Sequence, residues 1–176
     1  MKVVIKELKT EEINTEFLND FNRYQEVNES YIKKNEKWII EKKMEKTIIN
    51  WDNEYKKRRV KNIIKFINEK GFAIGGFENK QLIGFACLLN EKFGTKKQYI
   101  ELKYLYISYE YRNKGIGKKL LDLCIEKAKE FGANKVYISA GTSIETQKFY
   151  IKYGFKDAME LKEEYNEDDR QMEYEI

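Results

Sequence analysis

The chain has 176 residues, 41% of them hydrophobic and 14% aromatic, so we expect a single domain over residues 1–176 with a substantial core. Charged residues reach 36%, but the signs nearly cancel at a formal net charge of +4, which does not favour a nucleic-acid partner. The sequence contains no histidine, which excludes histidine-based catalytic triads, histidine-ligated zinc and a histidine general base.

The N-terminal part of the chain is expected to be mainly helical after one strand. Residues 3–8 have the pattern of a short strand, and residues 11–21 are expected to form a helix capped by Thr10. Between residues 29 and 69 the apolar residues recur at roughly helical intervals, which predicts two or three helices with a break near residues 50–53. Gly71 would close this region as the residue that follows the last helix.

After Gly71 the pattern changes to strands and helices in turn. The expected elements are, in order, a hairpin of strands 72–77 and 81–90 around a turn at 78–80, a loop at 91–97, a strand at 98–108, a helix at 116–131, a strand at 135–140, a helix at 143–152, a strand at 155–159, an acidic loop at 160–169 and a last strand at 171–176. This order predicts a mixed α/β (α+β) domain.

The two cysteines, Cys87 and Cys124, lie in apolar stretches without C-x-x-C spacing, so we interpret both as packed core thiols in a reduced interior. Residues 1–8 lack the long apolar run of a signal peptide, and no stretch has the roughly 18 apolar residues of a membrane span. We therefore expect a cytoplasmic protein without a membrane partner.

The junction between the expected strand 98–108 and the following helix reads Arg-Asn-Lys-Gly-Ile-Gly at residues 112–117. A helix N terminus presents backbone N–H groups without partners and a partial positive charge, which together bind anions. Gly115 and Gly117 lack Cβ atoms, so a phosphate group could approach the backbone closely, and neighbouring lysines could add charge. Taken alone, the same pattern is compatible with a tight turn that carries solvated lysines, and it is neither a P-loop nor a dinucleotide fingerprint.

The flanks of this junction resemble the GNAT superfamily of N-acetyltransferases. The family signature is [Q/R]-x-x-G-x-[G/A] after a strand that ends roughly in E-x-x-x-L-x-V, and this chain has Glu101 to Ile107 followed by the 112–117 motif. A second family element, N-x-x-A-x-x-F-Y-x-x-x-G-F, corresponds to residues 143–155, with Ser143 and Thr146 in place of the usual Asn and Ala. The resemblance runs from about residue 71 to the C terminus and implies a mostly antiparallel central sheet, helices on both faces, and a splayed strand pair that forms an acetyl-CoA cleft.

The resemblance also implies how the co-substrate acetyl-CoA is bound, without a metal. Backbone groups of the motif would hold the pyrophosphate, the preceding strand would hold the pantetheine arm, and the N–H of Leu105 would stabilise the oxyanion. The implied cofactor-binding residues are Leu105, Tyr106, Ile107, Arg112, Asn113, Lys114, Gly115, Ile116, Gly117, Lys118, Ser143 and Phe149.

Two catalytic residues follow from the same resemblance, for direct attack of a neutral amine on the thioester. Glu101 matches the position of the general base, acting directly or through a water, although a strand Glu could equally pair with a lysine such as Lys103. Tyr150 matches the general acid, because a phenol pKa near 10 is close to that of a thiol, although it could simply pack on the sheet beside Phe149.

The resemblance implies an acetyl-CoA-dependent N-acetyltransferase acting on a primary amine of a small molecule or peptide, with a homodimer as one possible assembly. The alternative is a non-catalytic acyl-CoA sensor that keeps the cleft. Residues 9–70 do not identify the acceptor: Trp38, Trp51 and Tyr55 could line a pocket or only pack, and the basic run 56–59 has the pattern of a solvated helix face. The acidic residues 160–169 could attract a cationic substrate or be plain surface.

Overall fold

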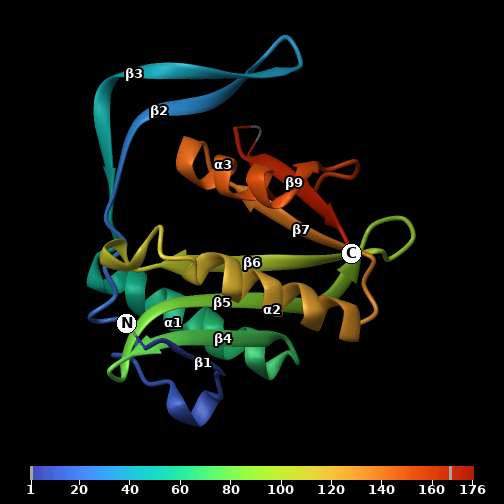
Figure 1. Ribbon diagram of the computed structural model, residues 1–176. Helices are drawn as coiled ribbons and strands as arrows, with labels where there is room; N and C mark the ends of the chain where they lie inside the picture. The colour runs from blue at the N-terminus through green and yellow to red at the C-terminus, as the bar shows by residue number, and fades with distance from the viewer. Residues whose placement is uncertain (1, 167) are drawn as a thin grey trace.

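The computed structural model describes residues 2–166 and 168–176. Met1 and Glu167, which fall in the expected domain and the expected acidic loop, lie outside the described residues. The described strands include a seven-stranded sheet with the order β1-β4-β5-β6-β7-β9-β8 (Figure 1). Its strands are β1 (Val4–Glu7), β4 (Phe72–Glu78), β5 (Gln81–Phe93), β6 (Tyr99–Ile107), β7 (Lys135–Ala140), β8 (Lys156–Asp157) and β9 (Arg170–Glu175).

Neighbouring strands of this sheet are antiparallel except β6 and β7, which run parallel. The pairing of β6 with β7 ends at Glu101 and Tyr137, although β6 continues to Ile107 and β7 to Ala140. Figure 1 shows the two strands diverging beyond this point. The predicted fold, a mostly antiparallel sheet with one splayed strand pair, is confirmed.

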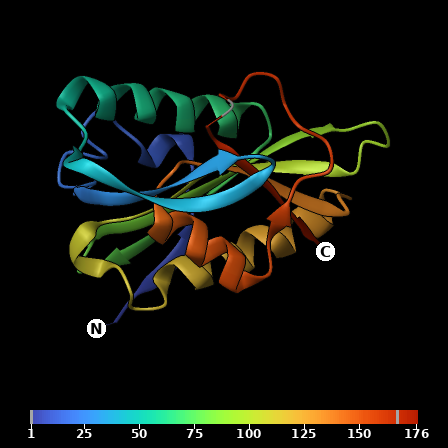
Figure 2. The ribbon, with the colours of Figure 1, turned by 90° about the horizontal axis from the view of Figure 1, so that it is seen from above.

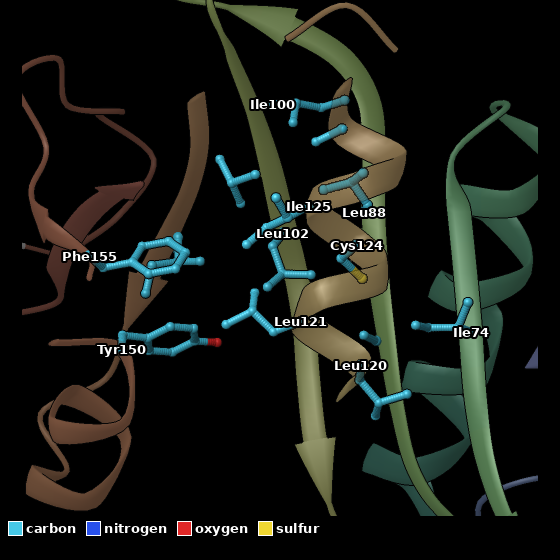
Figure 3. Close-up of a cluster of buried hydrophobic side chains, with 14 of the residues drawn as sticks. Ile74, Leu88, Ile100, Leu102, Leu120, Leu121, Cys124, Ile125, Tyr150 and Phe155 are labelled. Atoms are coloured by element: carbon cyan, nitrogen blue, oxygen red, sulfur yellow. The ribbon is translucent and has the colours of Figure 1, made fainter. Parts of the chain in front are cut away.

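Helices cover both faces of the sheet, as expected. On one face α2 (Ile116–Glu130) and α3 (Ile144–Tyr153) pack on a cluster of buried side chains that includes Leu88, Leu121 and Phe155 (Figure 3). On the other face α1 (Asn53–Asn68) and residues 8–21 pack on a second cluster around Phe21 and Phe85. The two 3-10 helices are η1 (Thr10–Glu12) and η2 (Tyr109–Tyr111).

A bulge in β6 distributes its side chains between these two clusters. Cys87 pairs with Tyr104 and Leu88 pairs with Leu102, so Lys103 is an extra residue between the two pairs. As a result, Leu102 belongs to the cluster under α2, whereas Tyr104 belongs to the cluster under α1. The bulge lies immediately after Glu101, where β6 separates from β7.

The prediction of helices between residue 29 and the break near residues 50–53 is wrong, because a long hairpin of β2 (Gln25–Lys34) and β3 (Lys37–Ile49) occupies that segment; the break and the helix after it are confirmed by α1. Its two-residue turn has positive φ at both Asn35 (48°) and Glu36 (61°), which suits a tight hairpin. The Ile-rich and Thr-containing composition favours strands, but much of the hairpin is exposed and the burial alternation that marks a half-buried strand is weak.

The hairpin extends from the sheet as an arm that bends over α3 (Figure 1). Seen from above, the arm crosses between α1 on one side and α2 and α3 on the other (Figure 2). The N–H of Tyr31 donates to the carbonyl of Thr142 at 2.9 Å, and the side chain of Gln25 donates to Ser143 Oγ at 2.7 Å. These bonds attach the arm to the start of α3.

Two smaller expectations are also corrected. Residues 11–21 form a single 3-10 turn and further turns instead of a helix, and the Asn14 side chain accepts a hydrogen bond from the N–H of Glu16 at 3.0 Å, which competes with helix formation. The residue with left-handed backbone after α1 is Lys70 (φ 65°), not Gly71. Gly71 is needed for space, since a Cβ there would lie 2.7 Å from the carbonyl oxygen of Phe66.

The helices after residue 115 and their glycine ends are as predicted, with Gly132 (φ 74°) and Gly154 (φ 116°) in the left-handed region. Both cysteines are fully buried, as predicted, and burial raises the pKa of each thiol. None of the helices in the described residues has the length and apolar character needed to cross a bilayer.

Candidate active site

The junction between β6 and α2 has the open geometry that its glycines predict. Asn113 (φ 59°) and Gly115 (φ 77°) adopt left-handed backbone, which turns the chain into the helix. No side chain caps α2, and the first N–H of the helix with an intrahelical acceptor is that of Lys119, which donates to the Gly115 carbonyl at 3.2 Å. The N–H groups that precede it are therefore available to an anionic ligand.

A cavity of about 580 Å³ opens beside this junction. It lies between the last residues of β6, the N terminus of α2 and the side chains of α3. Ten of the predicted site residues line it: Leu105, Tyr106, Ile107, Arg112, Asn113, Gly115, Gly117, Lys118, Phe149 and Tyr150. We call it the larger cavity.

Three predicted cofactor-binding residues do not line the larger cavity. Ile116 is buried in the core under α2. The Lys114 ammonium lies 5.1 Å from the ring centre of Tyr111. Ser143 is also buried, and its hydroxyl accepts the hydrogen bond from Gln25.

The basic side chains at the junction mostly bind the protein itself. Nε of Arg112 donates to the carbonyl of Ile107 at 3.3 Å, which ties the junction to the end of β6. Lys118 forms an ion pair with Asp122 one turn further along α2, at 2.8 Å. At this junction the backbone N–H groups at the start of α2 are therefore freer to bind an anion than the side chains of Arg112 and Lys118.

Tyr150 reaches the larger cavity from α3. Its ring packs edge-on against Phe149 and Phe155, with 5.1 Å between ring centres in both pairs. Figure 3 shows the ring extending from α3 towards Leu121. Burial raises the pKa of Tyr150, so the phenol is protonated at neutral pH, as a proton donor must be.

Glu101 lies at the point where β6 and β7 separate, and only 1% of it is exposed. Its carboxylate pairs with Lys103 at 3.0 Å and with Lys162 at 2.6 Å, and it accepts a hydrogen bond from the hydroxyl of Tyr165. Burial is the strongest single influence and by itself would lower the pKa of Lys162, but the hydrogen bonds and charges of Glu101 and Glu164 together outweigh it and leave that pKa raised. The pairing with Lys103 was foreseen from the sequence, whereas the contacts with Lys162 and Tyr165 were not.

Glu101 lines a second cavity of about 300 Å³, and Tyr106 lines both cavities. We call the second one the smaller cavity. The structure thus brings Tyr150 together with the predicted cofactor residues and places Glu101 in an adjoining space. The other residues of the smaller cavity are Arg59, Leu102, Lys103, Tyr104, Ser139, Tyr165 and Asp169.

Several of these residues were not predicted from the sequence. Arg59, expected on a solvated helix face, instead packs against the rings of Tyr55 and Tyr104. Arg23 and Gln25 line the larger cavity from the segment that leads into β2, and no motif marks them. Only the path of the hairpin places them there.

Two of the acidic residues before β9 contact other residues of the protein instead of being free surface charges. Glu160 accepts a hydrogen bond from the N–H of Thr95 at 2.8 Å, and Glu164 pairs with Lys103 at 3.1 Å and with Lys162 at 3.3 Å. Among the described residues, no group of three or more His, Cys, Asp and Glu side chains is arranged to hold a metal ion.

A mostly antiparallel sheet that opens beside an uncapped helix N terminus, with a tyrosine facing the opening, is the arrangement that the resemblance to the GNAT superfamily implies. The sequence matches the profile of the acetyltransferase (GNAT) family over residues 19–155. The chain therefore belongs to the GNAT family of acetyltransferases.

The curated proteins include a relative named as an uncharacterized N-acetyltransferase, YvbK, of Bacillus subtilis (strain 168), which is 32% identical over 97 residues. That match covers 54% of this chain and 60% of the relative, so it spans about three-fifths of the relative's length.

Solved structures of acetyltransferases share the fold across nearly the whole chain. A nourseothricin acetyltransferase superposes with a TM-score of 0.73 at 11% identity, covering 99% of each chain. A candidate streptothricin acetyltransferase of Bacillus anthracis strain Ames, solved with acetyl coenzyme A, gives 0.70 at 19% identity and covers 98% of this chain and 96% of its own. The PaiA N-acetyltransferase of Thermoplasma acidophilum, solved with coenzyme A, gives 0.64 at 21% identity and covers 100% of both.

Proposed function

We propose that the protein is an N-acetyltransferase, with residues 1–176 as one domain, that transfers the acetyl group of acetyl-CoA to a primary amine. The observation that carries the proposal is the larger cavity, which joins the uncapped N terminus of α2, the end of β6 and the Tyr150 side chain. The complexes named for two structural relatives, one with acetyl coenzyme A and one with coenzyme A, support the choice of co-substrate.

In this proposal the pyrophosphate of acetyl-CoA binds the free N–H groups at the start of α2, and the pantetheine arm follows residues 105–107. The amine attacks the thioester directly while both substrates are bound. The N–H of Leu105 stabilises the oxyanion, and the protonated phenol of Tyr150 donates a proton to the leaving thiolate.

Glu101 is the proposed general base. Lys103, Lys162 and Tyr165 already contact its carboxylate oxygens. This arrangement favours proton transfer through a water over direct contact with the amine. The same contacts would also suit a purely structural carboxylate, which is why a non-catalytic acyl-CoA sensor is the second candidate.

Two measurements separate these functions. Calorimetry with acetyl-CoA should give binding, and the absence of both heat and thermal stabilisation would refute the assignment of the larger cavity. Thiol release in the presence of an amine panel should identify an acetylated amine; acetyl-CoA binding without thiol release for any amine would establish the sensor instead.

The role of Glu101 is tested by Glu101→Gln in the same assay. As the general base, Glu101 accepts protons only when it is ionised, so the variant should lose turnover and lose the acidic limb of the pH–rate profile. A variant that is less stable but has an unchanged pH–rate profile would make Glu101 a structural residue.

A further inference from the structure

Two arginines near the meeting point of the two cavities have no acidic partner among the residues that the structure describes. Among residues 2–166 and 168–176, neither Arg23 nor Arg59 forms an ion pair with a carboxylate within 4.0 Å. Nε of each arginine is buried without a hydrogen-bond partner in the same described residues. A buried cationic donor left in this state is costly unless a ligand supplies the missing anion.

The Arg59 guanidinium is held in place by aromatic rings. Its Cζ lies 4.5 Å from the ring centre of Tyr104, 4.6 Å from that of Tyr55 and 5.8 Å from that of Trp51, and it donates a hydrogen bond to the Tyr55 hydroxyl. These neutral partners restrict its orientation but do not neutralise its charge. The guanidinium is thus oriented in advance for an anionic oxygen group.

The position of the two cations links them to the reaction centre. Arg59 lines the smaller cavity and Arg23 lines the larger one. Between them lies Tyr106, which lines both cavities, and Arg23 Cζ is 5.4 Å from its ring centre. A small molecule in the smaller cavity would therefore contact Arg59 beside the strand along which the thioester is proposed to lie.

The acidic residues of the smaller cavity do not provide the missing partner. Glu101 is already bound by Lys103 and Lys162. Asp169 lines the same cavity but forms no ion pair with Arg59. Among the described residues, the cavity thus presents the Arg59 guanidinium without an ion-pair partner and, in Asp169, a separate carboxylate, a distribution that suits a ligand with one anionic and one cationic end.

We propose that the acceptor is a small primary amine that also carries an anionic oxygen group, a carboxylate or phosphate, and that Arg59 binds this group. The inference rests on the proposed function and specifies its substrate class. A cavity of about 300 Å³ is at the lower end of ligand-site sizes, so the acceptor is comparable in size to a single amino acid.

The first test uses the unaltered protein and matched acceptors. Amino acids are compared with their carboxamides, with the corresponding decarboxylated amines and with aminoalkyl phosphonates, in the thiol-release assay with saturating acetyl-CoA. One charge-assisted contact predicts that kcat/KM for the best anionic amine exceeds that for its neutral analogue by roughly tenfold to a hundredfold, mainly through KM. Comparing kcat/KM for the amino acids with kcat/KM for the aminoalkyl phosphonates shows which anionic group is preferred.

The second test uses variants on α1. Arg59→Gln should bring the acid-to-carboxamide ratio of kcat/KM close to one, while Arg59→Lys should keep part of it because the charge remains without the planar fork. Arg58→Gln is the matched control: Arg58 is exposed and lines neither cavity, so the ratio should be unchanged. The affinity for acetyl-CoA should be the same in all three variants.

Three results would overturn the proposal. They are equal kcat/KM for acids and carboxamides, a preference for polyamines, and a loss of kcat/KM in Arg59→Gln that is the same for the acid and for its carboxamide. If acetyl-CoA binds but no amine is acetylated, the proposed function fails, and calorimetry of the acid and carboxamide pairs in the presence of coenzyme A decides this inference separately. Binding of an acid that Arg59→Gln abolishes supports it, and no binding of any acid overturns it.

Discussion

The substitution Gly117→Ala should raise the stability of the protein and lower its affinity for acetyl-CoA. Gly117 is the second residue of α2, and its φ is not in the left-handed region. A Cβ there would lie 3.5 Å and 3.6 Å from two atoms of the Phe149 ring and 3.7 Å from Ile107, which are ordinary van der Waals contacts. The fold can therefore accept the methyl group without rearrangement.

The size of both effects follows from this geometry. Replacing Gly by Ala in a helix stabilises it by up to about 1 kcal/mol, which for a chain of this length raises Tm by roughly 2–4 °C. The same methyl group points towards Phe149 and Ile107, which line the larger cavity beside the free N–H groups of α2. Weakening one or two charge-assisted hydrogen bonds to the pyrophosphate should reduce acetyl-CoA affinity by roughly tenfold to a hundredfold.

Thermal unfolding and calorimetry with acetyl-CoA measure the two effects separately. Gly115→Ala is the matched control for stability, because nothing lies within 4 Å of a Cβ there but its φ is +77°. It should lower stability by about 1 kcal/mol, the opposite sign. Wild-type acetyl-CoA affinity in Gly117→Ala would refute the placement of the pyrophosphate at α2, and a large loss of stability would refute the packing argument.

Three further changes test individual side chains. Tyr150→Phe should lower turnover by roughly ten- to a hundredfold with unchanged acetyl-CoA affinity, because the ring packing is kept and only the proton donor is lost; unchanged turnover would remove Tyr150 from the mechanism. Cys124→Ala should cost about 1 kcal/mol of stability and retain activity, since the buried thiol has a raised pKa; loss of catalysis in a folded variant would make it a nucleophile. Glu173 is fully buried, and its bonds to Lys135, Tyr99 and the N–H of Met159 outweigh the effect of burial and lower its pKa. Its contribution to stability is therefore present above the unfolded-state pKa near 4.3 and lost as the pH falls below it, so the Tm deficit of Glu173→Gln should shrink from pH 7 to pH 3; a deficit independent of pH would contradict this.

The sequence alone determined most of the fold after residue 71 and the open N terminus of α2 beside the larger cavity. There the signals are local: Gly132 and Gly154 end helices, an apolar face repeats along α2, and the glycines at 115 and 117 open the helix N terminus. Such features depend on a few neighbouring residues, so a pattern of a dozen residues is enough to predict them. The same locality explains why most of the residues that line the larger cavity from β6 and α2 could be named from the sequence.

Only the tertiary structure decided the region that would contact the acceptor. The hairpin at 25–49 lacks a strong strand pattern because much of it is exposed, and its strands were mistaken for helices. Lys162 reaches Glu101 across 61 residues of sequence, and Arg59 lies beside Tyr104 because α1 packs against the face of the sheet that carries Tyr104. These pairings depend on how the elements pack together, and no local pattern in one sequence encodes which charged side chains will meet.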